Sequence, residues 1–252
     1  MTSQLFAICF RSPRPSEPAR FWSEVLGWRP AGGTDGGPGE DVVLLPPDGA
    51  GFRIRFLPGQ EPKTGQNRAH FDLTSTSPED QRATVARALE HGGRHIDVGQ
   101  TPDEGHVVLA DPDGNEFCVI EPGNKFLADT GLIGALACDG TQEVGYFWSR
   151  ALGWPLVWNQ DEETAIQSPD GGTKITWGGP PVAPKTGVNR LFFELVLPDG
   201  VGLEEEGERL VSLGASRPGS GAGDGGDRGD RGVLMLDPDS NEFTVRESQP
   251  HF

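Results

Sequence analysis

The 252-residue sequence predicts an α+β fold made of four βαβββ modules, arranged as two tandem halves. Two observations carry this prediction. Three segments of the first half recur in the second half in the same order, and within each half a strand, a helix and a hairpin follow one another twice. The repeats set the number of halves, and the order of elements sets the number of modules in each half.

The internal repeat is visible at three places along the chain. Residues 20–28, 63–73 and 111–119 recur as residues 146–154, 185–195 and 237–245. Identical residues occupy six of nine, seven of eleven and seven of nine positions, and the offsets are 126, 122 and 126 residues. Chance does not produce three ordered matches of this quality. We therefore predict two domains, residues 1–123 and residues 128–252.

The elements of the first module follow from its apolar pattern. Residues 5–10 form an apolar run typical of a strand. We expect Ser16 to cap a helix that buries one apolar face and ends at Gly27. Residues 42–45 and 52–56 flank a Pro-Asp-Gly turn signal, which predicts a hairpin after the helix.

The second module repeats this order. Residues 68–73 predict a strand, and Ser77 begins a capping-box pattern for a helix that runs to Gly92. Residues 107–110 and 116–120 are expected to pair across an Asp-Gly turn. Each half is therefore read as a pair of similar modules.

The second half supplies matching elements and one long insertion. Thr141 is expected to cap one helix, and residues 201–213 to form the other. Residues 31–40 and 217–232 are too poor in apolar side chains to pack, so both are predicted to be surface loops. The second loop precedes the last hairpin of its half, and is either a lid over a cleft or a tolerated insertion.

Composition excludes several classes of partner. The chain carries 38 acidic and 21 basic residues, for a formal charge of −17, which disfavours nucleic acid and membrane surfaces as partners. No apolar run approaches the roughly 20 residues that cross a bilayer. Cys9, Cys118 and Cys138 show no metal-type or disulfide-type spacing. These features predict a cytoplasmic protein in a reducing compartment.

Two motifs carry a resemblance to a known family. Phe-Trp-x-x-x-Leu-Gly-Trp ends at Trp28 and again at Trp154, and Asp-Pro-Asp-x-Asn-Glu-Phe begins at Asp111 and Asp237. The chain resembles the vicinal oxygen chelate superfamily of glyoxalases, bleomycin-resistance proteins and extradiol dioxygenases, and more narrowly the tandem glyoxalase-like proteins of actinomycete type. The resemblance implies two glyoxalase/bleomycin-resistance-like half-barrel domains. It leaves the chemistry open, because this fold hosts metal-dependent enzymes and metal-free drug-binding proteins.

The resemblance also implies where metal ligands would stand. Metal-dependent members place His, Gln or Glu on the first strand of each module and Glu on a last strand. His70 matches such a position, Cys118 stands where a Glu is expected, and the first strand around Phe6 is apolar. The corresponding positions of the second half are about Leu132, Phe192 and Thr244. Because a divalent site needs at least three converging N, O or S donors, we expect no metal cofactor; the alternative is a divalent metal at His70.

The alternation of side chains along strands predicts which residues face the clefts. In the first half the predicted cleft residues are polar: Arg53, Arg55, His70, Asp72, Glu116 and Cys118. This set either holds an anionic or hydrogen-bonding ligand, with His70 as the proton-transfer residue, or forms an internal ion-pair network. The sequence leaves both interpretations open.

In the second half the same reasoning selects a more aromatic set. The predicted cleft residues are Lys174, Thr176, Phe192, Glu194, Glu242 and Thr244. Trp158 has no aromatic counterpart in the first half and is predicted to stack on a planar ligand. The other tryptophans are assigned to the core. The repeated Lys-Thr-Gly-x-Asn-Arg segment precedes a strand and not a helix, so we interpret it as structural, with Arg68 and Arg190 paired to acids.

These patterns together predict a metal-independent, small-molecule-binding protein. It either sequesters a natural-product-like ligand as an antibiotic-resistance protein or transforms it in specialised metabolism. The alternatives are a metal-dependent lyase, isomerase or dioxygenase that uses His70, and a scaffold without a ligand. Because each half resembles one subunit of a dimeric family member, a monomer with an internal pseudo-dimer is sufficient, and a homodimer remains open.

Overall fold

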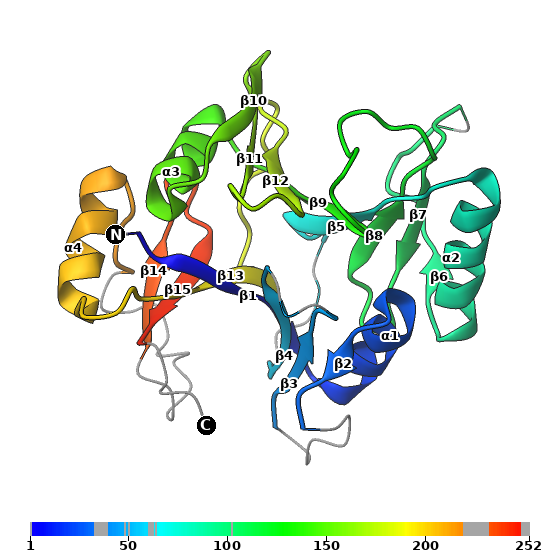
Figure 1. Ribbon diagram of the computed structural model, residues 1–252, viewed down its shortest axis with the longest axis horizontal. Helices are drawn as coiled ribbons and strands as arrows, with labels where there is room; N and C mark the ends of the chain where they lie inside the picture. The colour runs from blue at the N-terminus through cyan, green and yellow to red at the C-terminus, as the bar shows by residue number, and fades with distance from the viewer. Residues whose placement is uncertain are drawn as a thin grey trace.

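We analysed a computed structural model of the chain (Figure 1). It describes residues 2–32, 40–47, 49, 51–59, 63, 65–101, 103–218 and 232–247. Within these ranges, no helix has the length and apolar character needed to span a membrane.

The first half consists of two modules of the same kind. The first contains β1 (Gln4–Ser12), α1 (Ser16–Leu26), β2 (Arg29–Pro30), β3 (Val42–Leu45) and β4 (Arg53–Pro58). The second contains β5 (Ala69–Leu73), α2 (Pro78–Glu90), β6 (Arg94–His95), β7 (Val107–Ala110) and β8 (Glu116–Val119). Both follow the predicted order of one strand, one helix and three strands.

The second half repeats this plan, with two strands after the last helix among the described residues. Its first module contains β9 (Ile133–Cys138), α3 (Gln142–Leu152), β10 (Leu156–Gln160), β11 (Glu163–Gln167) and β12 (Lys174–Trp177). Its last contains β13 (Leu191–Val196), α4 (Leu203–Leu213), β14 (Gly232–Leu236) and β15 (Glu242–Arg246). The α+β fold of four modules is confirmed. Most of the predicted loops at 31–40 and 217–232 lies outside the described residues, so the lid prediction stays a prediction.

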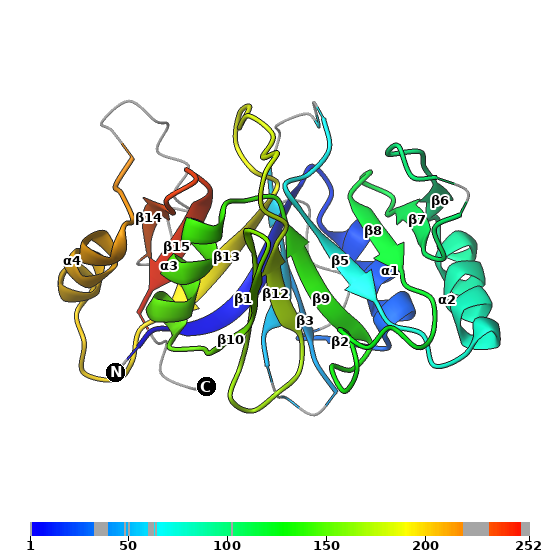
Figure 2. The ribbon, with the colours of Figure 1, turned by 90° about the horizontal axis from the view of Figure 1, so that it is seen from above.

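The strands form two sheets, and each sheet is shared between the halves (Figure 2). Sheet A has the order β14-β15-β13-β1-β4-β3-β2, and sheet B has the order β10-β11-β12-β9-β5-β8-β7-β6. The antiparallel pairs β1·β13 and β5·β9 join the halves at the centre of each sheet. Sheet A therefore combines the first and fourth modules, and sheet B combines the second and third.

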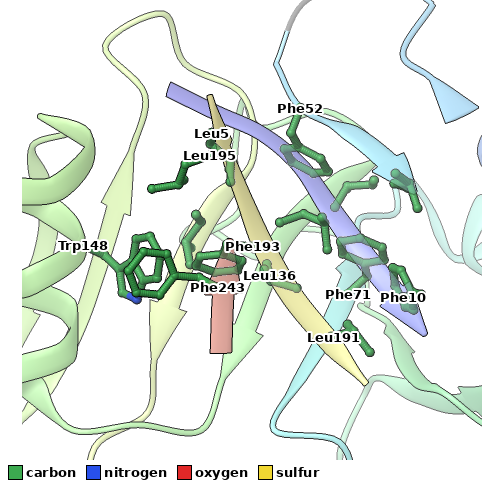
Figure 3. Packing of buried hydrophobic residues seen from close by; sticks show 14 of the residues in the cluster. Leu5, Phe10, Phe52, Phe71, Leu136, Trp148, Leu191, Phe193, Leu195 and Phe243 are labelled. Carbon is green, nitrogen blue, oxygen red and sulfur yellow. The ribbon is translucent and has the colours of Figure 1, made fainter. Parts of the chain in front are cut away.

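One apolar core lies between the two sheets (Figure 3). The rings of Phe10 and Phe71, which belong to different sheets, have centroids 5.7 Å apart. The rings of Trp148, on α3, and Phe193, on sheet A, have centroids 4.6 Å apart. Helices α1 and α2 cover one end of the molecule and α3 and α4 the other (Figure 1). Because successive side chains of a strand point to opposite faces, every second residue of each sheet points away from this core.

The tryptophans predicted to be core residues are in the core. Trp22, Trp148 and Trp177 are buried, while Trp28 and Trp154 pack partly buried against the same cluster. Trp22 lies on α1 and Trp148 on α3. Both helices end at a glycine with left-handed backbone, Gly27 and Gly153, as the repeated Leu-Gly-Trp predicts.

Each half contains one buried arrangement that we call a Trp–Asp–Asn anchor. In the first half, Trp22 Nε1 donates to Asp111 Oδ2 at 3.0 Å, and the backbone and side-chain amides of Asn115 donate to the same carboxylate at 2.8 and 2.9 Å. In the second half, Trp148 donates to Asp237 at 3.2 Å, with Asn241 in the role of Asn115. Each anchor ties the first helix of a half to the last hairpin of that half.

The capping predictions had mixed outcomes. Ser77 caps α2 as predicted, because its hydroxyl accepts a hydrogen bond from Asp80 N at 3.1 Å. The prediction for Ser16 is wrong: Pro15 is the N-cap residue, and Ser16 lies inside α1. Thr141 occupies the predicted cap position of α3, but its hydroxyl donates to Asp239 Oδ1 at 2.9 Å and makes no cap hydrogen bond.

The Lys-Thr-Gly-x-Asn-Arg segments connect the halves reciprocally. Arg68 Nη1 lies 3.3 Å from Oδ2 of Asp139 in the second half, and Arg190 Nη2 lies 3.7 Å from Oδ2 of Asp113 in the first half. The prediction that both arginines pair with acids is confirmed. The segments are structural connections across the pseudo-dimer.

We expect Trp22→Phe to lower the free energy of unfolding by about 1–3 kcal/mol, because it removes one donor from the buried Asp111 carboxylate. Trp148→Phe is expected to cost a similar amount. Urea denaturation measures both, with Trp28→Phe as the control, since Trp28 packs on the same core without belonging to an anchor. A loss for Trp22→Phe no larger than for Trp28→Phe would contradict the anchor's role.

The anchors also make a prediction about pH. Burial raises the pKa of Asp111 to about 6, although hydrogen bonds from Asn115 and Trp22 oppose the rise. The folded chain therefore binds a proton more tightly than the unfolded chain. The resulting stabilisation is complete below the unfolded-state pKa near 3.8 and is lost as pH rises through about 6.

Wild type is thus expected to gain about 1 kcal/mol of unfolding free energy relative to Asp111→Asn when the pH falls from about 7 to about 5. Urea denaturation at both pH values measures the difference. Equal pH dependence in the two proteins would show that Asp111 titrates normally in the folded state.

Candidate functional site

The outward face of sheet B presents one straight row of side chains. Successive register pairs connect His70 to Ala137, Ala137 to Thr176, Thr176 to Ala165, and Ala165 to Trp158. These residues come from five neighbouring strands of both halves. The row has a titratable group at one end, small residues in the middle and an indole at the other end.

A cluster of three reactive side chains surrounds the His70 end of the row. His70 Nε2 lies 3.4 Å from Asp72 Oδ1, two residues along β5, and Cys118 is the register neighbour of Asp72 on β8. One donor atom from each of His70, Asp72 and Cys118 lies within 4.8 Å of the other two. All three side chains are partly exposed, so the cluster is accessible from the face. The sequence predicted His70 as the central residue and did not predict that Asp72 and Cys118 both converge on it.

The cluster holds His70 as a cation. Burial lowers the pKa of His70, but the hydrogen bonds and negative charges of Asp72 and Cys118 outweigh burial and raise the pKa to about 10. The other two thiols differ in their surroundings: burial raises the pKa of Cys9 well above its usual value and also raises that of Cys138. The structure thus gives Cys118 the acid–base neighbours that a lone cysteine on a strand lacks.

An aromatic wall stands across the face from this cluster. Lys174 Nζ donates to the carbonyl of Phe126 and lies 4.5 Å from the centroid of its ring. The ring of Phe126 meets that of Trp158 edge to face, with centroids 6.0 Å apart. Lys174 is two strands from Asp72, which corresponds to about 10 Å across the sheet. Phe126 is the wall residue next to Lys174, and Trp158 contacts its ring.

The outward face of sheet A has a different centre, a buried ion pair. Arg55 Nη1 donates to both carboxylate oxygens of Glu194, at 2.5 and 2.8 Å, and Arg55 Nη2 donates to Asp41 at 2.6 Å. Arg55 and Glu194 come from different halves and are both buried. Of the first-half residues for which an internal ion-pair network was the alternative, Arg55 forms such a pair, and its partner is Glu194 of the second half.

Arginines also stack on phenylalanines of this face. Arg53 and Arg246 each lie 4.3 Å from the centroid of the Phe6 ring, and Arg11 lies 4.6 Å from that of Phe192. Thr244 stands beside Glu194 in the register of β13 and β15. Sheet A thus presents a cationic face where sheet B presents the His70 cluster.

The predicted grouping of cleft residues by halves is wrong. Arg53 and Arg55 lie on sheet A, with Phe192, Glu194 and Thr244, whereas His70, Asp72, Glu116 and Cys118 lie on sheet B, with Lys174 and Trp158. The reason is that β1 pairs with β13 and β9 with β5, so each face takes one module from each half. Alternation assigns each residue to one face of its own strand, but it does not predict which strand lies beside it.

Two further corrections concern single positions. Glu116 lies at the end of its strand, where its carboxylate accepts from Lys63 Nζ at 2.5 Å and from Asn67 N at 3.2 Å. It belongs to the Lys-Thr-Gly-x-Asn-Arg connection, as Glu242 does in the second half. The first-strand positions beside the sites are Cys9 and Ala137, because these pair with Arg55 and His70; they are not Phe6 and Leu132.

Sequence reasoning missed several residues that line the two faces. Phe126 lies in the connection between the halves, and Asp41 lies at the end of a polar loop. Arg11 and Arg246 do continue the alternation of β1 and β15 beyond the residues that we predicted. A longer alternation window would have found the two arginines; nothing in the sequence indicates the other two.

The cluster on sheet B has two chemical capabilities. A histidine held by a carboxylate beside a thiol can transfer protons and activate a nucleophile. The same imidazole, carboxylate and thiol form the one group of three such donors within the described ranges, and this donor set fits a borderline-soft divalent ion such as zinc. Either use places the chemistry at His70.

Comparison with solved structures identifies similar folds. The crystal structure of glyoxalase I from Zea mays matches with a TM-score of 0.67 at 16% identity, over 98% of this chain and 92% of that chain. The crystal structure of a putative dioxygenase from Bacillus subtilis matches with a TM-score of 0.60 at 15% identity, over 99% of this chain and 86% of that chain. At such identities these likenesses show the fold alone. No curated protein matches the sequence.

The family comparison covers most of the chain. The sequence profile of the glyoxalase-like domain matches residues 7–120 and, a second time, residues 134–246. These two ranges correspond to the two halves of the internal repeat, and the matching folds agree with the predicted resemblance to the vicinal oxygen chelate superfamily. The chain therefore belongs to the glyoxalase-like domain family and contains the domain twice.

Proposed function

We propose that the chain binds a small organic molecule on the outward face of sheet B and acts on it without a metal, with His70 as the proton-transfer residue. The observation that carries this proposal is the convergence of His70, Asp72 and Cys118 on one accessible face. Sequestration alone requires no titratable cluster, so the cluster favours a chemical step over simple storage of a ligand.

The shape of the face supports a ligand of modest size. The floor next to His70 consists of Ala137 and Thr176, whose small side chains leave room above the sheet. Lys174, which lies against the Phe126 ring, is two strands or about 10 Å from Asp72, a separation that suits a planar molecule reaching from the aromatic wall to the cluster. Lys174, beside the wall, supplies a cation for a polar substituent.

The three side chains have complementary roles in this proposal. Asp72 orients the imidazole of His70 through their 3.4 Å contact. His70, which is protonated, then donates a proton to the bound molecule. Cys118, next to both, supplies the nucleophile: its sulfur adds to an electrophilic carbon of an unsaturated ligand, the π bond breaks, His70 delivers a proton to the atom that takes the electron pair, and the thiol proton returns to His70. We therefore expect an electrophilic ligand, to which the chain's own residues supply nucleophile and acid.

Metal independence is supported by the strands adjoining β5. The residues level with His70 on β9 and β12 are Ala137 and Thr176, so neither supplies an imidazole or a carboxylate. The three donors come from β5 and β8 alone and already contact one another. A metal would have to displace the proton and the ion pair of His70.

The convergence of three donors also favours a second candidate, a metal-dependent enzyme of the same superfamily. His70, Asp72 and Cys118 would hold the ion, leaving its remaining position toward the open face. The bound ion would supply Lewis-acid chemistry. This metal-dependent candidate uses the same ligand face as the metal-free one. The two differ in whether His70 carries a proton or binds the ion.

Metal analysis separates the two candidates. We expect wild type, after exposure to excess Zn²⁺, Ni²⁺ or Mn²⁺ and desalting, to retain well below one equivalent of metal and to show no rise in Tm that depends on His70. His106→Ala is the matched control for His70→Ala, because His106 forms a pair with Glu104 at the same 3.4 Å distance. Stoichiometric metal lost in His70→Ala and Cys118→Ser, but kept in His106→Ala, would establish the metal-dependent candidate.

Alkylation by iodoacetamide tests the reactive cluster directly. We expect Cys118 to react first among the three thiols, and His70→Ala to slow its reaction by about tenfold near neutral pH, since it removes the cationic neighbour that hydrogen-bonds to the Cys118 sulfur. Peptide mass spectrometry over time measures each thiol separately, and His106→Ala is again the control. A Cys118 rate that His70→Ala leaves unchanged would remove Cys118 as the nucleophile of the proposal.

A further inference from the structure

Strand β10 leaves an apolar edge of sheet B exposed. Among the described strands it pairs only with β11, so its other side faces away from the sheet at the margin of the molecule (Figure 1). All five of its residues are exposed. Leu156, Val157 and Trp158 are three successive large apolar side chains, and their exposed fractions are 37%, 42% and 37%. A contiguous apolar patch of this kind is typical of a surface that contacts another molecule.

The other sheet edges in the described ranges are protected. β2 is two residues long, Arg29–Pro30, and β6 is also two residues long, Arg94–His95. Beside β14, Ser216 forms a bridge to Leu236. Short strands, charged side chains and proline are the usual features that prevent one sheet edge from pairing with another.

The internal repeat makes this contrast specific to β10. Pro30 and Leu156 stand at the same offset of 126 residues that relates residues 20–28 to residues 146–154. The same position of the domain therefore carries a protected edge in the first half and an apolar edge in the second half.

β10 offers apolar contacts on both sides of its free edge. A register shift at Val157 separates Leu156, which is level with the core residue Ile166, from Trp158 of the outward row. Apolar side chains on this edge therefore point to both faces of sheet B. The ring of Phe126 contacts that of Trp158, which reduces the side-chain freedom that the indole would lose on binding a partner.

The charges around β10 favour an antiparallel partner strand. No residue of β10 is charged, while Asp161 and Glu162 form the acidic turn to β11, both with positive φ. A second copy that pairs antiparallel about Trp158 has its acidic turn at the opposite end of the edge. Three strand residues span about 10 Å, so the two turns lie about 20 Å apart, more than twice the screening length of about 8 Å at physiological salt.

We propose that β10 is an interface between two copies of this chain, which pair antiparallel through their β10 edges and join two copies of sheet B. A two-fold axis perpendicular to the sheet relates the copies, so the same backbone donors and acceptors meet in both directions. The outward faces then lie on the same side, with both Trp158 side chains near the axis. The proposal is independent of the proposed function, because no residue of the His70 cluster takes part.

The size of this contact predicts a weak dimer. Stable interfaces of standard size bury about 800 Å² on each partner, whereas complete burial of one aromatic side chain covers about 150–250 Å². Leu156, Val157 and Trp158 are already more than half buried within the chain. These side chains and the strand edge therefore supply well under the standard area, and we expect a dissociation constant above about 10 μM.

Sedimentation velocity of the full chain between about 1 and about 500 μM tests the proposal. We expect monomer at the low end and a growing dimer fraction at the high end. Val157→Lys is expected to weaken the dimer at least about tenfold, because it places two like charges where the copies meet. Val211→Lys is the matched control, since Val211 is 43% exposed against 42% for Val157 and lies on α4. It makes the same change in net charge and is expected to dimerise like wild type.

Two measurements on wild type do not depend on any variant. Backbone amides of residues 156–160 are expected to exchange hydrogen more slowly at about 500 μM than at about 1 μM, while amides of α4 exchange equally at both. Raising NaCl from about 0.05 to about 0.5 M is expected to strengthen the dimer, because salt screens the repulsion between two copies that each carry a formal charge of −17.

Four results would overturn the proposal. These are monomer at every concentration, a dimer that Val157→Lys leaves unchanged, a dimer that Val211→Lys weakens as much as Val157→Lys does, and β10 amide exchange that is independent of concentration. A dimer that salt weakens would also contradict it, since ion pairs would then hold the copies together.

Discussion

The structure depends on two antiparallel strand pairs, β1 with β13 and β5 with β9. Each pair joins a first-half strand to a second-half strand at the centre of a sheet, so neither half completes a sheet alone. The reciprocal contacts of Arg68 and Arg190 cross the same junction. The junction of the two halves is therefore made within one chain, by strands from both copies of the domain.

The duplication separates scaffold from chemistry. The Trp–Asp–Asn anchors face the core and are the same in both halves, because packing and buried hydrogen bonding leave little freedom there. The outward faces are free of this constraint. His70 of sheet B corresponds in the repeat to Phe192 of sheet A, and Cys118 corresponds to Thr244. One scaffold therefore carries an acid–base cluster on one face and a cationic one on the other.

The two faces also differ in how charge is compensated. On sheet B the imidazole, carboxylate and thiol stand together at a partly open surface. On sheet A the central arginine is buried against two carboxylates, which gives rigidity and no reactivity. Membership of the glyoxalase-like domain family accounts for the common frame, and the side chains on each face determine its use.

The sequence alone determined the duplication, the four modules, the core tryptophans and the outward direction of residues such as His70 and Arg55, because repeats and strand alternation are local properties. Only the tertiary structure decided which of these residues meet. Whether Arg55 lies beside His70 or beside Glu194 depends on which strands pair across the centre, and that choice involves residues more than a hundred positions apart. Alternation specifies the face of a strand; long-range pairing specifies its neighbours.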